Sequence, residues 1–429
     1  MPVNLSLFEN APASRRAALG PNDFPDGIRH FRDHGSATLE TAAHVESAGG
    51  TLIYVPIFIN EFWTSKQRAA HSIHEISYRA CFKPQLPAFF IDRLTKHGDR
   101  VYDPFMGRGT TLIESALRSR IPIGCDVNPL SSVLVRPRLN PPTLLDIKRR
   151  LSSIRLDQVC TMPEDLLVFY HPETLAQICA LREYFLEKEA ANGMDSVDQW
   201  IRMVAINRLT GHSSGFFSVY TMPPNQAVSI VSQRKINEKR KQIPQVRNIT
   251  DIILKKSKSL VKDLCPSDTE NLRKTSRHAT LLTRDSRRTP EIESQSVSLV
   301  VTSPPFLDIV DYATDNWLRC WFIGIDATSV PIAILKHLSD WKQHMFEAFQ
   351  ELARVLRIGG YIAFEVGEVR GGKIKLEEAV IPCAVNAGLE PVLVLINQQE
   401  FTKTANCWGV ENNSKGTNTN RIVLAKRCS

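Results

Sequence analysis

The sequence predicts an α/β fold in which a largely helical lobe interrupts a mostly parallel sheet. Two observations lead to this prediction. Residues 100–126 run through a strand, a glycine-containing turn, a helix, a second strand and an acidic residue, which is how a parallel α/β sheet opens. Strand patterns ending in polar residues return only after residue 278, and the intervening segment has helical spacing. The sheet is therefore expected to be built from two separate stretches of chain.

The first stretch follows an N-terminal extension, residues 1–50, which is mixed in composition and punctuated by Gly and Pro. Residues 51–134 form the first part of the sheet domain. We expect a short strand at 51–57, a loop at 82–87, a helix at 88–95 and a strand with its turn at 100–109. A helix then begins at Thr110 and ends near residue 118. A second short strand, 121–125, ends at Asp126.

Residues 135–278 are predicted to form the inserted helical lobe. Helical spacing occurs at 144–154, 172–190 and 200–209. Between residues 232 and 262, ten Lys and Arg residues stand against two acids, so the local net charge is 10 − 2 = +8. A solvated helix face would explain this cluster, but its place inside the insert favours contact with nucleic-acid phosphates. The candidate DNA-binding residues are Arg234, Lys235, Lys239, Arg240, Lys241, Lys255 and Lys256.

The second stretch of the sheet domain is residues 279–429. A strand near 281–283 precedes Asp285, and the apolar run 297–301 reads as a buried strand. An amphipathic helix at 341–356 precedes a Gly-Gly pair, 359–360, which is a signal for a helix C-cap. A further strand is expected at 361–366, and a closing strand pair at 391–397 and 421–425.

The composition sets broad limits on function. The chain has 429 residues, 43% of them hydrophobic and 23% charged, which is typical of a globular protein with a substantial core. Its net charge of +8 modestly favours binding to a polyanionic partner. The nine cysteines are scattered and form no CxxC pair, which argues against a disulfide framework or a zinc site and favours a reducing cytoplasm. We expect neither a secretory signal nor a membrane span.

The first unusual string is DPFMGRGTT at residues 103–111. Asp103, at the end of a strand, can meet an ammonium group or hold the turn. Gly107 and Gly109 allow the backbone to approach a ligand closely, and Thr110 opens a helix whose free N–H groups face the same ligand. Together these features predict a ligand-binding turn at the edge of the sheet.

Two further carboxylates follow neighbouring strands. Asp126 is placed to accept from both ribose hydroxyls of an adenosine, and Asp285 from an adenine amino group. Taken singly, either acid is also explained by a helix cap or a surface turn. A dinucleotide fold uses similar logic, but its third fingerprint glycine would fall at Leu112, so the nicotinamide pattern is not met.

The second unusual string is TSPPF at residues 302–306, directly after a predicted buried strand. An aromatic amine is a poor nucleophile because its lone pair is delocalised into the ring. The Ser303 hydroxyl and the Pro304 carbonyl are expected to accept from the amine and to stabilise positive charge that develops on nitrogen. Phe306 would stack on the ring, and the two prolines, with Pro305, would hold the acceptors in place. A base must leave its duplex to reach such a site.

Together the two strings resemble the S-adenosylmethionine-dependent DNA amino-methyltransferases, which act on cytosine N4 or adenine N6. The string at 103–111 is similar to the family's cofactor loop, and TSPPF is similar to its catalytic (D/N/S)PP(Y/F) signature. The segment 82–87 resembles the Lys-Pro segment that precedes the cofactor loop. The matched parts cover about residues 74–132 and 280–370. The resemblance implies a class I, Rossmann-like methyltransferase fold with a seven-stranded sheet and a late antiparallel strand.

The resemblance also implies site residues and partners. S-adenosylmethionine is the implied cofactor and double-stranded DNA the implied substrate, with a restriction or defence system as a possible partner and without a metal. The base-binding residues would be Ser303, Pro304, Pro305 and Phe306. The cofactor-binding residues would be Lys83, Pro84, Asp103, Pro104, Phe105, Gly107, Gly109, Thr110, Thr111, Asp126 and Asp285.

The target base is less sharply defined. Serine at the first catalytic position is commoner in enzymes that methylate cytosine N4, whereas aspartate or asparagine is commoner in adenine N6 enzymes. We therefore favour cytosine N4 and keep adenine N6 as the alternative. An RNA base methyltransferase and a non-catalytic DNA-binding subunit are further alternatives. Two departures from the family pattern stand out: the cofactor loop precedes the catalytic motif, and the insert comes before Asp285.

Overall fold

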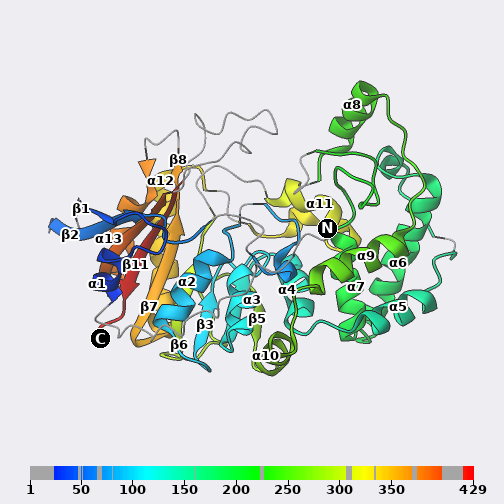
Figure 1. The fold of residues 1–429 in the computed structure, drawn as a ribbon. Coiled ribbons are helices and arrows are strands. Elements are labelled where there is room, and N and C mark those ends of the chain that lie inside the picture. The colour runs from blue at the N-terminus through cyan, green and yellow to red at the C-terminus, as the bar shows by residue number, and fades with distance from the viewer. Residues whose placement is uncertain are drawn as a thin grey trace, which may run out of the picture.

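The structure is a computed structural model, and its elements divide between a large sheet domain and a group of helices (Figure 1). It describes residues 24–46, 50, 52–64, 70–79, 81–158, 160–222, 227–305, 312–332, 335–369, 374–398 and 419–429. Within this part of the chain, no helix is both long enough and apolar enough to cross a membrane. The described residues also contain no group of three or more His, Cys, Asp or Glu placed to hold a metal ion.

The sheet has nine strands in the order β1-β2-β10-β11-β7-β6-β3-β4-β5. The neighbours β7, β6, β3, β4 and β5 are parallel to one another, whereas β11 is antiparallel to both β7 and β10. The strands are β1 (Leu39–Glu46), β2 (Leu52–Asn60), β3 (Arg100–Asp103), β4 (Ile121–Asp126), β5 (Thr280–Thr283), β6 (Val297–Thr302), β7 (Leu356–Val366), β10 (Glu390–Gln398) and β11 (Thr419–Lys426). A separate small ribbon pairs β8 (Glu368–Val369) with β9 (Ile374–Lys375).

The expected α/β, Rossmann-like fold class is confirmed, but the expected count of seven strands is wrong. Seven strands from β10 to β5 make up the mostly parallel sheet with its late antiparallel strand. The hairpin of β1 and β2 adds two more, because β2 pairs in parallel with β10. β1 lies at the sheet edge and exposes most of its side chains. Ala43 and Val45 are its two buried residues, so the apolar signal in its sequence is short.

Helices cover both faces of the sheet. On one face, α12 (Leu338–Val355) and α13 (Leu376–Asn386) pack through Trp341, Phe349 and Val380. On the other face, α1 (Phe24–Arg29) and α2 (Gln85–Leu94) pack through Phe24, Phe89 and Phe90. The helices α3 (Thr110–Leu117), α4 (Pro129–Leu139) and α10 (Pro266–Ser276) enclose a smaller apolar cluster next to β4. The sheet is thus shielded on both sides, as a parallel sheet requires.

The remaining helices gather beside the sheet domain, on the right of Figure 1. They are α5 (Leu144–Ser153), α6 (Pro172–Ala190), α7 (Ser196–Ile206), α8 (Ile230–Arg240) and α9 (Ile249–Val261), together with α11 (Tyr312–Phe322). Three short 3-10 helices lie at Ser72–His74, Glu164–Val168 and Ala327–Ser329. A core of their own, centred on Trp200, Phe185 and Phe322, holds these helices together.

The sequence suggested that the pair Gly359 and Gly360 caps a helix. This expectation is wrong. α12 ends at Val355, and both glycines lie inside β7, which begins at Leu356. Gly359 has a φ of +77°, and its N–H donates to the carbonyl of Arg427 at 2.7 Å. The glycines therefore permit an irregular start of the strand, which allows β7 to begin directly at the end of the helix.

Candidate active site

A cavity opens where β3, β4 and β6 end and the chain leaves β5, which is the edge at which α/β folds usually bind ligands. Its volume is about 1020 Å³ when the open mouth is included. Both motif strings contribute to its wall. The lining residues are Tyr78, Cys81, Phe82, Asp103, Pro104, Phe105, Met106, Gly107, Arg108, Thr110, Asp126, Val127, Asn128, Arg284, Asp285, Ser286, Arg287, Ser303, Pro305, Pro331, Ile332 and His344.

The two motif strings are hydrogen-bonded to each other at the base of this cavity. The Thr302 hydroxyl donates to Asp103 Oδ1 at 2.6 Å, and the Thr111 hydroxyl donates to the carbonyl of Val301 at 3.0 Å. Residues about 200 positions apart in the sequence therefore meet because β3 and β6 are adjacent and parallel. The cofactor-like turn and the catalytic-like motif share one cavity.

Asp103 is the deepest carboxylate of the site, with only 1% of its surface exposed. Besides the Thr302 hydroxyl, it accepts a hydrogen bond from the N–H of Phe105 at 3.1 Å. Burial outweighs these hydrogen bonds and raises the pKa of Asp103 from 3.8 to about 7. The group therefore holds the turn and also faces the cavity, where it changes charge near neutral pH.

The turn after β3 depends on two glycines with positive φ. Gly107 has a φ of +45° and Gly109 a φ of +75°. A Cβ added at Gly109 would lie 2.3 Å from Val135 Cγ2, so α4 closes tightly on the turn and only glycine fits. Gly109 also precedes Thr110, the first residue of α3, so the turn leads directly into a helix N-terminus.

Asp126 closes the opposite side of the turn. Its carboxylate accepts from the N–H of Gly107 at 2.9 Å and from the N–H of Asn128 at 2.9 Å. Burial, which is the dominant effect, raises its pKa above the ordinary value of 3.8. Because Asp126 ends β4 and lines the cavity, it lies where the sequence expectation of a ribose-binding acid requires it.

Asp285 also lines the cavity, but its carboxylate is already in an ion pair. Arg287 contacts it at 2.6 Å and also contacts Glu347 on α12 at 2.6 Å. The hydrogen bond from Arg287 is the main reason that the pKa of Asp285 lies below its ordinary value. An adenine amino group would therefore share this carboxylate with a guanidinium.

At the end of β6, Ser303 and Pro305 line the cavity, while Pro304 is buried beside them. The indole N–H of Trp341 donates to the Pro305 carbonyl at 3.0 Å, so α12 fixes this segment. Phe306, the expected stacking ring, lies outside the described residues. Behind Ser303, the buried carboxylate of Glu365 contacts the Ser303 hydroxyl and accepts from Asn420 Nδ2 at 2.5 Å.

Several expected cofactor residues do not line the cavity. Lys83 is half-buried, and burial lowers its pKa; Pro84 lies on the far side of the same segment, against α3. Gly109 shapes the turn, and the Thr111 hydroxyl donates to the neighbouring strand β6. Sequence reasoning in turn missed Arg108 and His344, which do line it. Arg108 stands inside the motif string itself, whereas His344 comes from α12, and no sequence signal links it to the site.

The expected DNA-contacting residues lie on α8 and α9, among the helices beside the sheet domain (Figure 1). Five of the seven side chains belong to α8 or its C-cap and are exposed, and Lys255 on α9 is exposed too. Arg240 stacks over the Tyr220 ring at 3.7 Å, and Arg234 lies 3.6 Å from Asp165. Lys256 differs: it is half-buried and lies 3.8 Å from Glu75, and burial lowers its pKa to about 8.

Comparison with known proteins places this geometry in a family. Residues 56–131, which include β3, the glycine turn and β4, match the family model described as DNA methylase of the N6/N4 type. This segment is similar to the DNA methylase family. The resemblance to the DNA amino-methyltransferases that the motifs suggested is thereby confirmed.

Two curated relatives match part of the chain. One is the type II methyltransferase M.MjaII of Methanocaldococcus jannaschii, 34% identical over 89 residues, which is 20% of this chain and 17% of that protein. The other is the type II methyltransferase M.MvaI of Kocuria varians, 28% identical over 111 residues, which is 25% of this chain and 23% of that protein. The match thus spans about a fifth of the length of these relatives.

Two solved structures have a low overall similarity to this chain. The rRNA methyltransferase aviRa from Streptomyces viridochromogenes is 13% identical with a TM-score of 0.34, over 85% of this chain and 94% of that one. TrmN from Thermus thermophilus is 10% identical with a TM-score of 0.30, over 83% of this chain and 51% of that one.

Proposed function

We propose that this protein is a DNA methyltransferase that transfers a methyl group from S-adenosylmethionine to an exocyclic amine of a flipped base, with cytosine N4 as the favoured acceptor. The observation that carries the proposal is the hydrogen bond between Thr302 and Asp103, which joins the two motifs in one cavity. The match of residues 56–131 to a DNA methylase supports the same activity.

The residues of the cavity fit the proposed cofactor. S-adenosylmethionine, when bound, supplies an activated methyl group on a sulfonium. It carries an ammonium, a ribose diol and an adenine, and the cavity offers a carboxylate for each in Asp103, Asp126 and Asp285. The glycine turn adds backbone N–H groups at the start of α3. The donor and acceptor groups of the wall therefore match those of the ligand.

On the acceptor side, the Ser303 hydroxyl is the group that meets the base amine. It would accept one N–H of the amine, while the Pro304 carbonyl accepts the other, and both would stabilise the positive charge that develops on nitrogen. Because the contact with Trp341 fixes Pro305, these acceptors are held in place before the base arrives. No covalent bond between enzyme and base is needed.

Double-stranded DNA is the proposed substrate. The exposed basic residues of α8 extend from the helical lobe, which suits contacts with phosphates while the base enters the cavity. We also propose that the segment 135–278 is the target-recognition lobe and that the enzyme works in the reducing cytoplasm, beside a restriction or defence system. All eight described cysteines are free thiols, which suits such a compartment.

The test is product analysis. The purified protein is incubated with methyl-labelled cofactor and mixed duplex DNA, and the DNA is digested to nucleosides. Label in N4-methylcytosine is the expected result. Label on adenine N6 would establish the main alternative, and label in RNA but not in DNA would identify an RNA base methyltransferase. DNA binding without cofactor binding, measured by calorimetry, would identify a non-catalytic subunit.

A further inference from the structure

Three cationic side chains converge beside the glycine turn. Arg108 lines the cavity, Arg138 is completely buried below the turn, and Lys83 is half-buried nearby. Burial is the main reason that the pKa of Lys83 and the pKa of Arg138 are lowered, and the charge of Arg108 lowers both further; the pKa of Arg138 falls to about 9 in all.

None of these three cations has a carboxylate partner among the described residues. Arg138 donates to the carbonyls of Leu134 at 2.9 Å, of Ile73 at 3.4 Å and of Arg108. Arg108 donates to the carbonyl of Ile76 at 3.0 Å and to the Thr110 hydroxyl at 3.3 Å. Buried cations ordinarily have an anionic partner. Of the three, Arg108 is the one that lines the cavity, so it is the one that an entering anion can meet.

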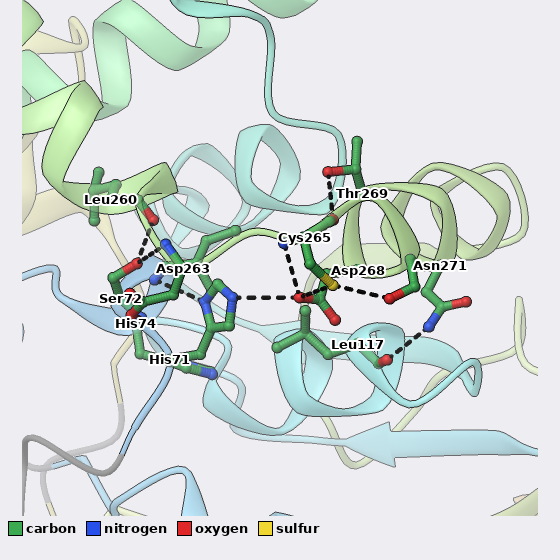
Figure 2. Close-up of polar contacts among 12 residues, drawn as sticks. His71, Ser72, His74, Leu117, Leu260, Asp263, Cys265, Asp268, Thr269 and Asn271 are labelled. Carbon is green, nitrogen blue, oxygen red and sulfur yellow. Dashed lines mark hydrogen bonds and ion pairs between the residues drawn. The ribbon is translucent and has the colours of Figure 1, made fainter. Parts of the chain in front are cut away.

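The place of Arg108 is fixed by a network on the side away from the cavity. Figure 2 shows the turn at Ser72–His74 held against the end of α9 and the start of α10. The Ser72 N–H donates to Asp263 Oδ2 at 3.0 Å, and its hydroxyl donates to the carbonyl of Leu260 at 3.0 Å. The Ile73 carbonyl of this turn accepts from Arg138, and the Ile76 carbonyl just after it accepts from Arg108. Both guanidinium groups are therefore hydrogen-bonded to the segment that α9 and α10 hold in place.

We propose that Arg108 binds the carboxylate of the cofactor's amino-acid end, together with the Thr110 hydroxyl and the N–H groups that open α3. The inference rests on the proposed function, because it takes S-adenosylmethionine as the ligand. Asp103 then faces the ammonium of the same amino acid, so the cavity presents one cation and one carboxylate to a zwitterion. Both side chains line the same cavity. Arg138 is a positioning residue that holds Arg108 through its carbonyl.

Two ligands distinguish binding of the carboxylate by Arg108 from a general effect of Arg108 on the shape of the cavity. S-adenosylhomocysteine carries the carboxylate, whereas 5′-methylthioadenosine lacks the whole amino-acid end. Arg108→Met should weaken binding of S-adenosylhomocysteine by roughly 10- to 100-fold in calorimetry, the range for a hydrogen-bonded charge pair, and leave 5′-methylthioadenosine unchanged. Arg108→Lys should recover part of the loss. The matched control is Arg100→Met, an exposed arginine at the opposite end of β3, which should change neither affinity.

Three outcomes would overturn the proposal. An equal loss for both ligands would show that Arg108 only shapes the cavity. An unchanged affinity for S-adenosylhomocysteine would show that Arg108 does not meet the carboxylate. A selective loss of affinity for duplex DNA would assign Arg108 to a phosphate instead. These results are independent of the product analysis, since a protein that transfers no methyl group can still distinguish the two ligands.

Discussion

At the residue scale, the proposed function assigns to Ser303 the contact with the base amine. Ser303 directly follows β6, lines the cavity and contacts the buried Glu365. Ser303→Ala removes one acceptor for the amine, so we expect kcat to fall by roughly 10²- to 10³-fold, as for the loss of one preorganised polar group in other enzymes. The affinity for S-adenosylhomocysteine should stay nearly unchanged in calorimetry.

The control for this variant is Ser296→Ala, which removes an exposed hydroxyl just before the opposite end of the same strand. It should leave both kcat and cofactor affinity unchanged. Equal losses of turnover and of S-adenosylhomocysteine affinity in Ser303→Ala would contradict the role of Ser303 as the group that meets the base.

Asp103 gives the site a pH dependence. Burial raises its pKa from 3.8 to about 7, so the group is neutral at pH 5.5 and largely ionised at pH 7.5. Only the ionised form attracts the ligand's ammonium, so the affinity for S-adenosylhomocysteine should rise roughly 25-fold between these pH values, which is the ratio of the two ionised fractions. Calorimetry across this range measures the slope.

Asp103→Asn is the matched variant, because the amide keeps the shape of the side chain and cannot ionise. Its affinity for S-adenosylhomocysteine should be low and nearly independent of pH. A slope equal to that of the wild type would assign the titration to another group in the cavity.

At the element scale, α8 is a polar helix that joins the rest of the lobe through hydrogen bonds. Gln233 and Gln242 donate to the carbonyl of Tyr220 at 3.0 and 2.9 Å, and Asn237 donates to the carbonyl of Val168 at 2.8 Å. Only Gln233 of this helix is buried. Apart from Arg240, which stacks over the Tyr220 ring, and Arg234, which lies beside Asp165, the exposed basic residues of α8 are left available for a polyanion.

We therefore expect the triple change Lys239→Gln, Arg240→Gln and Lys241→Gln to weaken binding to duplex DNA. Each lost phosphate contact should reduce the slope of log K against log salt by about 0.9. Fluorescence anisotropy with labelled duplex at several salt concentrations measures both effects.

The control is a triple change of basic residues on or next to α10, which lies at the opposite end of the molecule in Figure 1. Arg273→Gln, Lys274→Gln and Arg277→Gln remove the same charge from exposed positions. If both triple variants lose the same slope, the effect reflects net charge alone, and the specific role of α8 is wrong.

The elements also show how far a sequence can predict the fold and the site. The 172–190 helix, the turn at 103–111 and the acids that end β3 and β4 follow local rules of periodicity and glycine placement, and the structure has them there. Position in space does not follow such rules. His344 reaches the cavity because α12 packs across β6 and β7, and Gly359 lies in a strand because β7 starts at the end of a helix. Neither fact is encoded by neighbouring residues.

At the scale of the whole molecule, the hairpin of β1 and β2 extends the main sheet away from the cavity. β2 pairs with β10, at the other end of the sheet from β4 and β5. One buried side chain on β10 also joins this strand to the segment that follows β2. Asn397 on β10 accepts the N–H groups of Phe62 at 2.7 Å and Trp63 at 3.2 Å, and it donates to the Trp63 carbonyl at 3.2 Å.

Asn397→Ala should therefore lower stability without changing the site. The substitution leaves two buried N–H groups and one carbonyl without their partner, which costs about 3 kcal/mol in the free energy of unfolding. Urea denaturation measures this loss, and Gln398→Ala, the exposed next residue, should change the free energy of unfolding by less than about 0.5 kcal/mol. The affinity for S-adenosylhomocysteine should be equal in both variants, because the cavity lies on β3, β4 and β6. A loss of S-adenosylhomocysteine affinity in Asn397→Ala alone would contradict this prediction. It would show that contacts at β10 affect the shape of the cavity at β3, β4 and β6.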